Sequence, residues 1–174
     1  MRSSQRFFIG VSVLTSVFCV EVRSLLALNI STNQPIIRQT LAPGETVQGS
    51  IELVSHQTTP LRVKVYLEDW RYTSVGDGSK EFGPPKTLPR SCAEWVSVFP
   101  NELELPANGK KVVDYTIRVP EGASLNGGYV AVVFFEGSLG SSTQPTAMGQ
   151  KASATVQFSA RLGSLVFVDV KGTV

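Results

Sequence analysis

The sequence predicts an all-β, immunoglobulin-like antiparallel β-sandwich of about seven strands. Apolar residues alternate with polar ones at period two in several runs, which is typical of strands that are buried on one face. The 15 glycines and 10 prolines fall mostly between these runs, and no stretch has the period of an amphipathic helix. A closed barrel is the alternative architecture, because a strand pattern does not show whether a sheet closes on itself.

The first 24 residues have the pattern of a signal peptide. Arg2 and Arg6 precede an uncharged, mostly apolar run at residues 7–20. This run is shorter than the roughly 20 residues that a membrane-spanning helix needs. We therefore expect export and cleavage after Ser24, with a buried strand or an uncleaved anchor as the alternative.

The mature chain is expected to consist of a lead-in at residues 25–34 and one sandwich domain at residues 35–174. Its location would be outside the cytoplasm, in the periplasm or the cell envelope. Lipidation of Cys19 is disfavoured because Phe18, a large residue, precedes it. If Cys19 is removed with the leader, Cys92 is the only cysteine left and no internal disulfide can form.

The first half of the domain contains three expected strands, at residues 36–41, 47–53 and 61–68. In the second and third, the apolar residues that share one face are Val47, Ile51, Leu53, Leu61, Val63, Val65 and Leu67. Residues 71–90 are dense in glycine, proline and polar residues. They are expected to form a long connection or to carry a short edge strand.

The second half contains the remaining expected strands, at residues 93–99, 103–105, 112–119, 129–135 and 152–170. Pro100 and Pro120 end two of them, because proline has no N–H to donate to a ladder. Residues 129–135 are apolar on both faces, which predicts a central strand with a loop or a partner over its second face. Residues 137–150 are expected to form a loop, and Gly163 with Ser164 to bend or bulge the last strand.

Charge disfavours two classes of partner. The formal net charge of +2 arises from the leader, where Arg2, Arg6 and Arg23 outnumber Glu21, and the rest of the chain is balanced. No run of basic residues is longer than the pair at 110–111. Binding of nucleic acid or of an anionic membrane needs a concentrated basic face, so neither is expected, nor is a membrane span after the leader.

Catalysis is not expected either. His56 is the only histidine and lies in a polar turn, and Cys92 is expected to be a buried, inert thiol. One histidine and one mature cysteine do not fill a typical zinc site, and the glycines of "NGGY" lack the lysine of a phosphate loop. We therefore predict no enzyme, no metal and no cofactor. Trp70 and Trp95 are expected to pack in the core or at a sheet edge, with a binding platform as the alternative.

The stretch "EWVSVFPNELELPANGKKVVDYTIRVP" resembles the middle of the N-terminal domain of periplasmic pilus-assembly chaperones and their relatives. "LAPGETVQGSIELVSHQTTPLRVKVYLEDW" is similar to the first hairpin of those domains. "GGYVAVVFFE" also resembles the N-terminal domains of WxL-interacting cell-surface proteins. The resemblance extends loosely over residues 35–170 and implies the immunoglobulin-like fold.

In the chaperones, a strand near the end of this domain lends alternating apolar side chains to an unfinished subunit and completes its sheet. The resemblance places that role on "SLVFVDV", with Val166, Val168 and Val170 on one face. Arg38 stands near the position of the basic residue that anchors the subunit's terminal carboxylate. The second domain of such chaperones has no counterpart in the sequence, which suggests a stand-alone module or a truncated chain.

The sequence therefore favours a non-catalytic, exported, protein-binding sandwich of chaperone-like character. Its partner would be another exported protein or an envelope subunit, engaged by strand addition. The alternative is a structural or adhesive module of the cell envelope, whose last strand is buried in its own sheet. Val168→Asp separates the two, since it should weaken partner capture in the first case and unfold the domain in the second.

Overall fold

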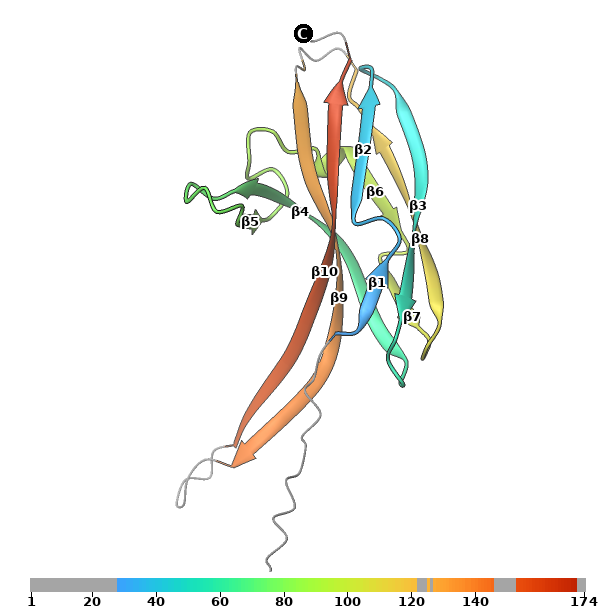
Figure 1. Cartoon of the computed structure of the whole chain (residues 1–174), viewed down its shortest axis with the longest axis vertical. Coiled ribbons are helices and arrows are strands. Elements are labelled where there is room, and N and C mark those ends of the chain that lie inside the picture. Colours follow the sequence, from blue (N-terminus) through green and yellow to red (C-terminus); the bar gives the residue numbers. More distant parts are fainter. Residues whose placement is uncertain (1–27, 122–124, 126, 146–152, 172–174) are drawn as a thin grey trace, which may run out of the picture.

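The computed structural model describes residues 28–121, 125, 127–145 and 153–171. The expected signal peptide, which includes Cys19, and residues 25–27 of the expected lead-in lie outside the described residues. Within them the chain forms two β-sheets that face each other, as the sequence predicts (Figure 1). No helix in the described part is both long and apolar enough to cross a membrane.

The first sheet has four strands in the order β1, β3, β8, β6. They are β1 (Ile30–Thr32), β3 (Thr46–Ser55), β8 (Lys110–Arg118) and β6 (Val96–Phe99). All neighbours in this sheet are antiparallel. The inward faces of β3 and β8 are the apolar faces that the alternation predicts, since Ile51, Leu53, Val113 and Ile117 are all fully buried.

The second sheet has the order β2, β10, β9, β4, β5, and β7 also pairs with β4. Its strands are β2 (Ile36–Leu41), β10 (Ser153–Val170), β9 (Gly128–Pro145), β4 (Leu61–Tyr72), β5 (Lys80–Gly83) and β7 (Glu102–Leu105). β2 runs parallel to β10, whereas the other pairs are antiparallel. The chain thus leaves the first sheet after β1 and joins the second sheet at β2.

Three local predictions are corrected. The strand expected at residues 93–99 begins with a 3₁₀ turn, η1 (Ala93–Trp95), and becomes extended only at Val96. β9 continues to Pro145 through most of the expected loop, because its small and polar residues pair in register with β10. The irregularity in that pairing lies between Phe158 and Ser159, whereas Gly163 pairs regularly with Phe134.

The main core lies between the two sheets. Close packing there requires a glycine at position 49, because a Cβ atom on Gly49 would lie 2.4 Å from the Tyr115 ring. The buried residues of this core come from both sheets, among them Ile37, Ile51, Leu53, Val63, Val65, Val113, Ile117, Val133, Phe135, Val166 and Val168.

A second, smaller apolar cluster covers the outer face of the second sheet. Trp70, Val132 and Phe134 are buried there, and Leu165 and Phe167 pack against them. β9 therefore has apolar neighbours on both faces and lies between β10 and β4, which confirms the central position predicted for residues 129–135. The sequence suggested a loop or a partner over this second face, whereas in the structure Trp70 of the adjacent strand β4 packs there.

Two parts of the second sheet project from the sandwich. The lower halves of β9 and β10 extend together beyond the first sheet, and the end of β4 forms a lateral arm with β5 (Figure 1).

Candidate partner-binding surface

The last strand, β10, has two halves with different surroundings. From Leu165 to Val170 it pairs with β9 on one edge and with β2 on the other. From Gln157 to Gly163 it also pairs with β9, but among the described residues no strand is hydrogen-bonded along its other edge, although β1 approaches β10 without pairing. We call the stretch from Gln157 to Gly163 the open edge of β10.

The three valines that the resemblance singles out lie in the paired half. Val166 and Val168 are fully buried, Val170 is 5% exposed, and all three belong to the core between the sheets. Partner binding at these valines stays a prediction. It would require β2 to detach and the valines to leave the core, because both edges of this half are already paired.

The backbone of the open edge offers hydrogen-bonding groups at alternate residues. Leu165 donates its N–H to the Pro35 carbonyl at 2.9 Å, on the side of β10 away from β9. Successive residues of a strand direct their backbone groups to opposite edges, so Ser159, Arg161 and Gly163 direct theirs to the same side as Leu165. No strand of the described chain receives them.

The side chains of the open edge continue the alternation of the core. Phe158, Ala160 and Leu162 lie on the face of β10 that also bears Val166 and Val168. Phe158 is 41% exposed, Ala160 and Leu162 are partly buried, and Leu162 packs against the core. The inward apolar row thus extends past the end of the sandwich, where the first sheet no longer covers it.

On the opposite, outer face of β10, the Arg161 side chain contacts residues of strands β9 and β4. Its guanidinium lies 4.0 Å from the centre of the Phe134 ring and makes hydrogen bonds of 3.0 and 3.1 Å to the two carboxylate oxygens of Glu68. The Tyr66 hydroxyl donates to Glu136 at 2.7 Å. Burial raises the pKa of that hydroxyl, so Tyr66 is a neutral donor at physiological pH.

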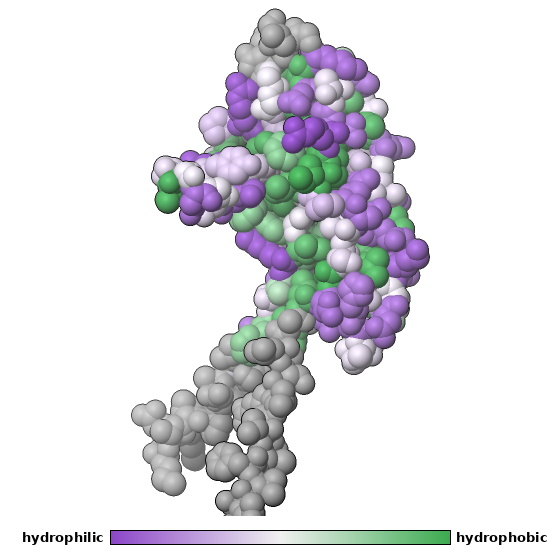
Figure 2. All heavy atoms as spheres, viewed as in Figure 1, coloured by the Kyte–Doolittle hydropathy of each residue, from purple (hydrophilic) through white to green (hydrophobic). Residues whose placement is uncertain are grey.

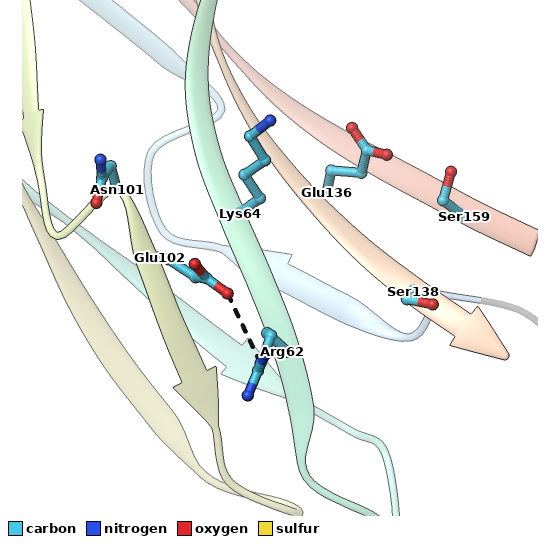
Figure 3. A pocket seen from close by; sticks show the side chains of 7 residues that line it. All are labelled: Arg62, Lys64, Asn101, Glu102, Glu136, Ser138 and Ser159. Atoms are coloured by element: carbon cyan, nitrogen blue, oxygen red, sulfur yellow. Dashed lines mark ion pairs between the residues drawn. The ribbon is translucent and has the colours of Figure 1, made fainter.

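A polar groove of about 470 Å³ lies beside the open edge. Figure 3 shows its lining residues, which are Arg62, Lys64, Asn101, Glu102, Glu136, Ser138 and Ser159. Lys64 and Glu136 are cross-strand neighbours on β4 and β9. Arg62 and Glu102 approach to 3.6 Å, and both side chains are well exposed. The two basic and two acidic side chains of this surface balance each other in formal charge, and an ion pair as exposed as Arg62–Glu102 contributes little to stability.

Arg38 does not join the three valines. It is exposed on β2, where its guanidinium lies over the Phe167 ring at 4.7 Å from the centroid. Its neighbour Ile37 is the residue that faces the core. Arg38 and the valines therefore lie on opposite faces of the second sheet, which separates the two features that the resemblance would combine.

The residues considered for catalysis either lie away from these surfaces or are chemically inert. Burial raises the pKa of the Cys92 thiol to about 12, which keeps the thiol protonated and unreactive. His56 is exposed and lies 3.2 Å from the Ser31 hydroxyl. No group of three or more His, Cys, Asp or Glu side chains in the described chain could hold a metal.

The outer aromatic surface is the feature that sequence reasoning mostly missed. Trp70 is 2% exposed and donates its indole N–H to the Ala131 carbonyl at 2.9 Å, so it packs rather than offering a flat platform. Phe167 and Tyr72 make edge-to-face contacts with it, at 5.4 and 5.3 Å between ring centres. The signal in the sequence was that apolar residues occupy both odd and even positions of "SLVFVDV", so both faces of this strand are apolar.

The fold is shared with domains of bacterial pilus chaperones. A chain of the Salmonella enterica SafA pilin in complex with the SafB chaperone is similar with a TM-score of 0.50 at 12% identity, over 84% of this chain and 56% of that chain. The E. coli chaperone DraB has a TM-score of 0.49 at 12% identity, over 83% and 56%. This chain thus spans a little over half the length of those chains.

A PapD-like domain of human CEP192 is similar over 94% of this chain and 96% of that chain, with a TM-score of 0.42 at 15% identity. At these identities the likeness shows the fold alone. No protein-family model matches the chain. No curated protein matches it either.

Proposed function

We propose that this protein is a non-catalytic, exported, protein-binding sandwich that takes an extended segment of another exported protein along the open edge of β10. Residues 1–24 would be its export signal, and residues 35–174 its binding domain. The observation that carries this proposal is the unpaired edge from Gln157 to Gly163, which projects beyond the sandwich. The fold shared with the SafA–SafB chain supports a chaperone-like role.

Physical reasoning favours a protein segment as the occupant. An edge strand with unpaired N–H and C=O groups is a template for another strand, and proteins usually block such edges with proline, lysine or a covering loop. The sequence "QFSARLG" contains neither proline nor lysine. At about 3.3 Å per residue the open edge offers about 20 Å of pairing, and Phe158 with Leu162 adds an apolar face against which alternate partner side chains can pack.

Ser159→Pro tests this proposal. Its N–H points away from β9, so proline removes a hydrogen bond from the partner and none from the β9–β10 ladder. The full tagged chain is expressed in its own host, recovered from the envelope fraction, and its co-purifying proteins are quantified by mass spectrometry. We expect Ser159→Pro to lose the partner that the unmodified chain retains.

Ser159→Ala is the matched control, because it removes the exposed hydroxyl but keeps the backbone N–H. Both variants should melt within a few degrees of the unmodified chain. Equal partner recovery with Ser159→Pro and Ser159→Ala would refute strand addition at this edge.

A structural or adhesive envelope module is the second candidate. It is favoured by the burial of Val166, Val168 and Val170 in the chain's own sheet, with β2 completing the edge. Recovery of the chain alone, folded and monomeric, would support this candidate against a chaperone-like role.

A further inference from the structure

A second open surface lies on the outer face of the second sheet, away from the open edge of β10. It is a groove of about 360 Å³ lined by Trp70, Arg71, Tyr72, Leu88, Pro89, Arg90, Val130 and Phe167. Figure 2 shows apolar residues gathered between the lateral arm and the body of the sandwich. Ile36 on β2 extends this apolar surface, since it is 54% exposed and pairs with Leu165. We call this surface the aromatic groove.

The base of the groove is a row of rings. Phe167 and Tyr72 each make an edge-to-face contact with Trp70, so the three rings run from β10 to the end of β4. Tyr72 is 59% exposed, and Phe167 and Val130 are partly buried. A concave space of this size, walled by aromatic and aliphatic groups, suits one large apolar side chain and its flanking backbone.

One wall is held rigidly. Asp69 is fully buried, and its carboxylate accepts hydrogen bonds from the backbone N–H groups of Thr87 at 2.8 Å and Leu88 at 2.9 Å, and from the Ser91 hydroxyl. The Val130 N–H also donates to the Arg90 carbonyl at 2.9 Å. A wall held in place before binding loses little conformational entropy when a ligand arrives, which favours binding.

Cations surround the row of rings: Arg71 and Arg90 line the groove itself, and Arg38 and Lys80 lie over its rings. Arg38 lies over Phe167 at 4.7 Å, and Lys80 lies over Tyr72 at 5.3 Å and over Trp70 at 5.9 Å. Neither cation has a carboxylate partner within the described chain. Arg71, by contrast, is paired with Glu81 at 2.7 Å. The two cations therefore stand at opposite ends of the ring row, where they can pair with carboxylates of a ligand.

We propose that the aromatic groove binds an extended peptide segment of a protein partner, in which one aromatic or large aliphatic side chain is flanked by carboxylates. The apolar side chain enters between Tyr72, Phe167 and the Leu88–Pro89 wall. The flanking carboxylates meet Arg38 at one end and Lys80 at the other. This site is separate from the open edge of β10, so one chain can hold a partner at both surfaces.

The test uses three capped peptides, acetyl-Asp-Trp-Asp-amide, acetyl-Ser-Trp-Ser-amide and acetyl-Lys-Trp-Lys-amide. Each is titrated into the ¹⁵N-labelled full chain. The chain has two tryptophans, so its spectrum contains two indole signals, of which Trp70 reports on the groove and Trp95 serves as an internal control. We expect the acidic peptide to bind about tenfold more tightly than the neutral one, the sum for two exposed ion pairs, and the basic peptide to bind more weakly still.

Variants separate the contributions of the rings and the cations. Tyr72→Ala should weaken all three peptides, whereas the double variant Arg38→Gln, Lys80→Gln should abolish only the preference for acid. Phe99→Ala is the matched control, because Phe99 is 75% exposed on the other sheet. Ser159→Pro should leave the titration unchanged, which distinguishes failure at the open edge of β10 from failure here.

Several results would overturn the proposal. These are equal affinity for the acidic and basic peptides, an acid preference that persists in the double variant, and absence of a saturable shift at the Trp70 indole. Sedimentation of the full chain adds one more test. A concentration-dependent dimer that Tyr72→Ala abolishes would mean that a second copy of the chain occupies the groove.

Discussion

Val168→Asp is the substitution for which the structure makes the sharpest prediction. The Val168 side chain is fully buried, and its backbone neighbours are Gln39 on β2 and Tyr129 on β9. Loss of the buried side chain costs about 1.5–3 kcal/mol. An unpaired carboxylate in that position adds several kcal/mol more. The total is comparable to the whole stability of a domain, about 5–15 kcal/mol, so the variant should be largely unfolded.

Circular dichroism and the dispersion of amide NMR signals measure this outcome, and urea denaturation gives the free energy of unfolding. Val168→Ala provides a graded version of the same loss, and about 2–3 kcal/mol is expected from the removed carbons and the cavity that remains. Phe158→Asp is the matched control, because Phe158 lies on the same strand but is 41% exposed. It should lower the stability by no more than about 1 kcal/mol.

A folded Val168→Asp variant with an unchanged urea midpoint would refute this reasoning. It would mean that the paired half of β10 leaves the core at little cost, with β2 detaching from its edge. In that case the binding role that the resemblance assigns to Val166, Val168 and Val170 would be favoured over the open edge.

Two further predictions concern the core. Burial raises the pKa of the Cys92 thiol in the folded state to about 12. The folded state therefore retains a proton that the unfolded state loses above a pH of about 8.5. The free energy of unfolding should fall as pH rises between these two values, by up to about 1.4 kcal/mol per pH unit. Urea denaturation of a Cys19→Ser variant across this pH range measures the effect. If adding Cys92→Ala left the same slope of unfolding free energy against pH, the prediction would be contradicted. Gly49→Ala should cost about 1–3 kcal/mol, because its Cβ would lie 2.4 Å from the Tyr115 ring. A urea midpoint equal to that of the unmodified chain would show that the ring moves aside freely.

Much of the fold could be predicted from alternation. The inward residues Ile51 and Leu53 of β3 and Val113 and Ile117 of β8 are buried as their period-two pattern indicates. The pattern also identified β9 as central, because residues of both parities are apolar there. These predictions succeed because the face of a strand that becomes buried is a local property of its residues.

The candidate site could be predicted only in part. The resemblance drew attention to the last strand and assigned the binding role to its paired half, which stays a prediction, whereas the unpaired edge of the other half could be found only in the structure. The aromatic groove combines Trp70 and Tyr72 from β4 with Phe167 from β10, residues almost 100 positions apart. Neither Phe167 nor Lys80 has a local pattern that distinguishes a groove wall from ordinary packing.

The sequence by itself determined that the chain is built of β-strands and which residues of those strands face the core, while it left a sandwich and a closed barrel as alternatives. Only the tertiary structure decided which edges are paired. Alternation encodes the face of a strand and carries no information about the strand beside it. The parallel addition of β2 therefore closed the edge of one half of β10, and because this pairing begins at Leu165 it left the open edge where we expect a partner.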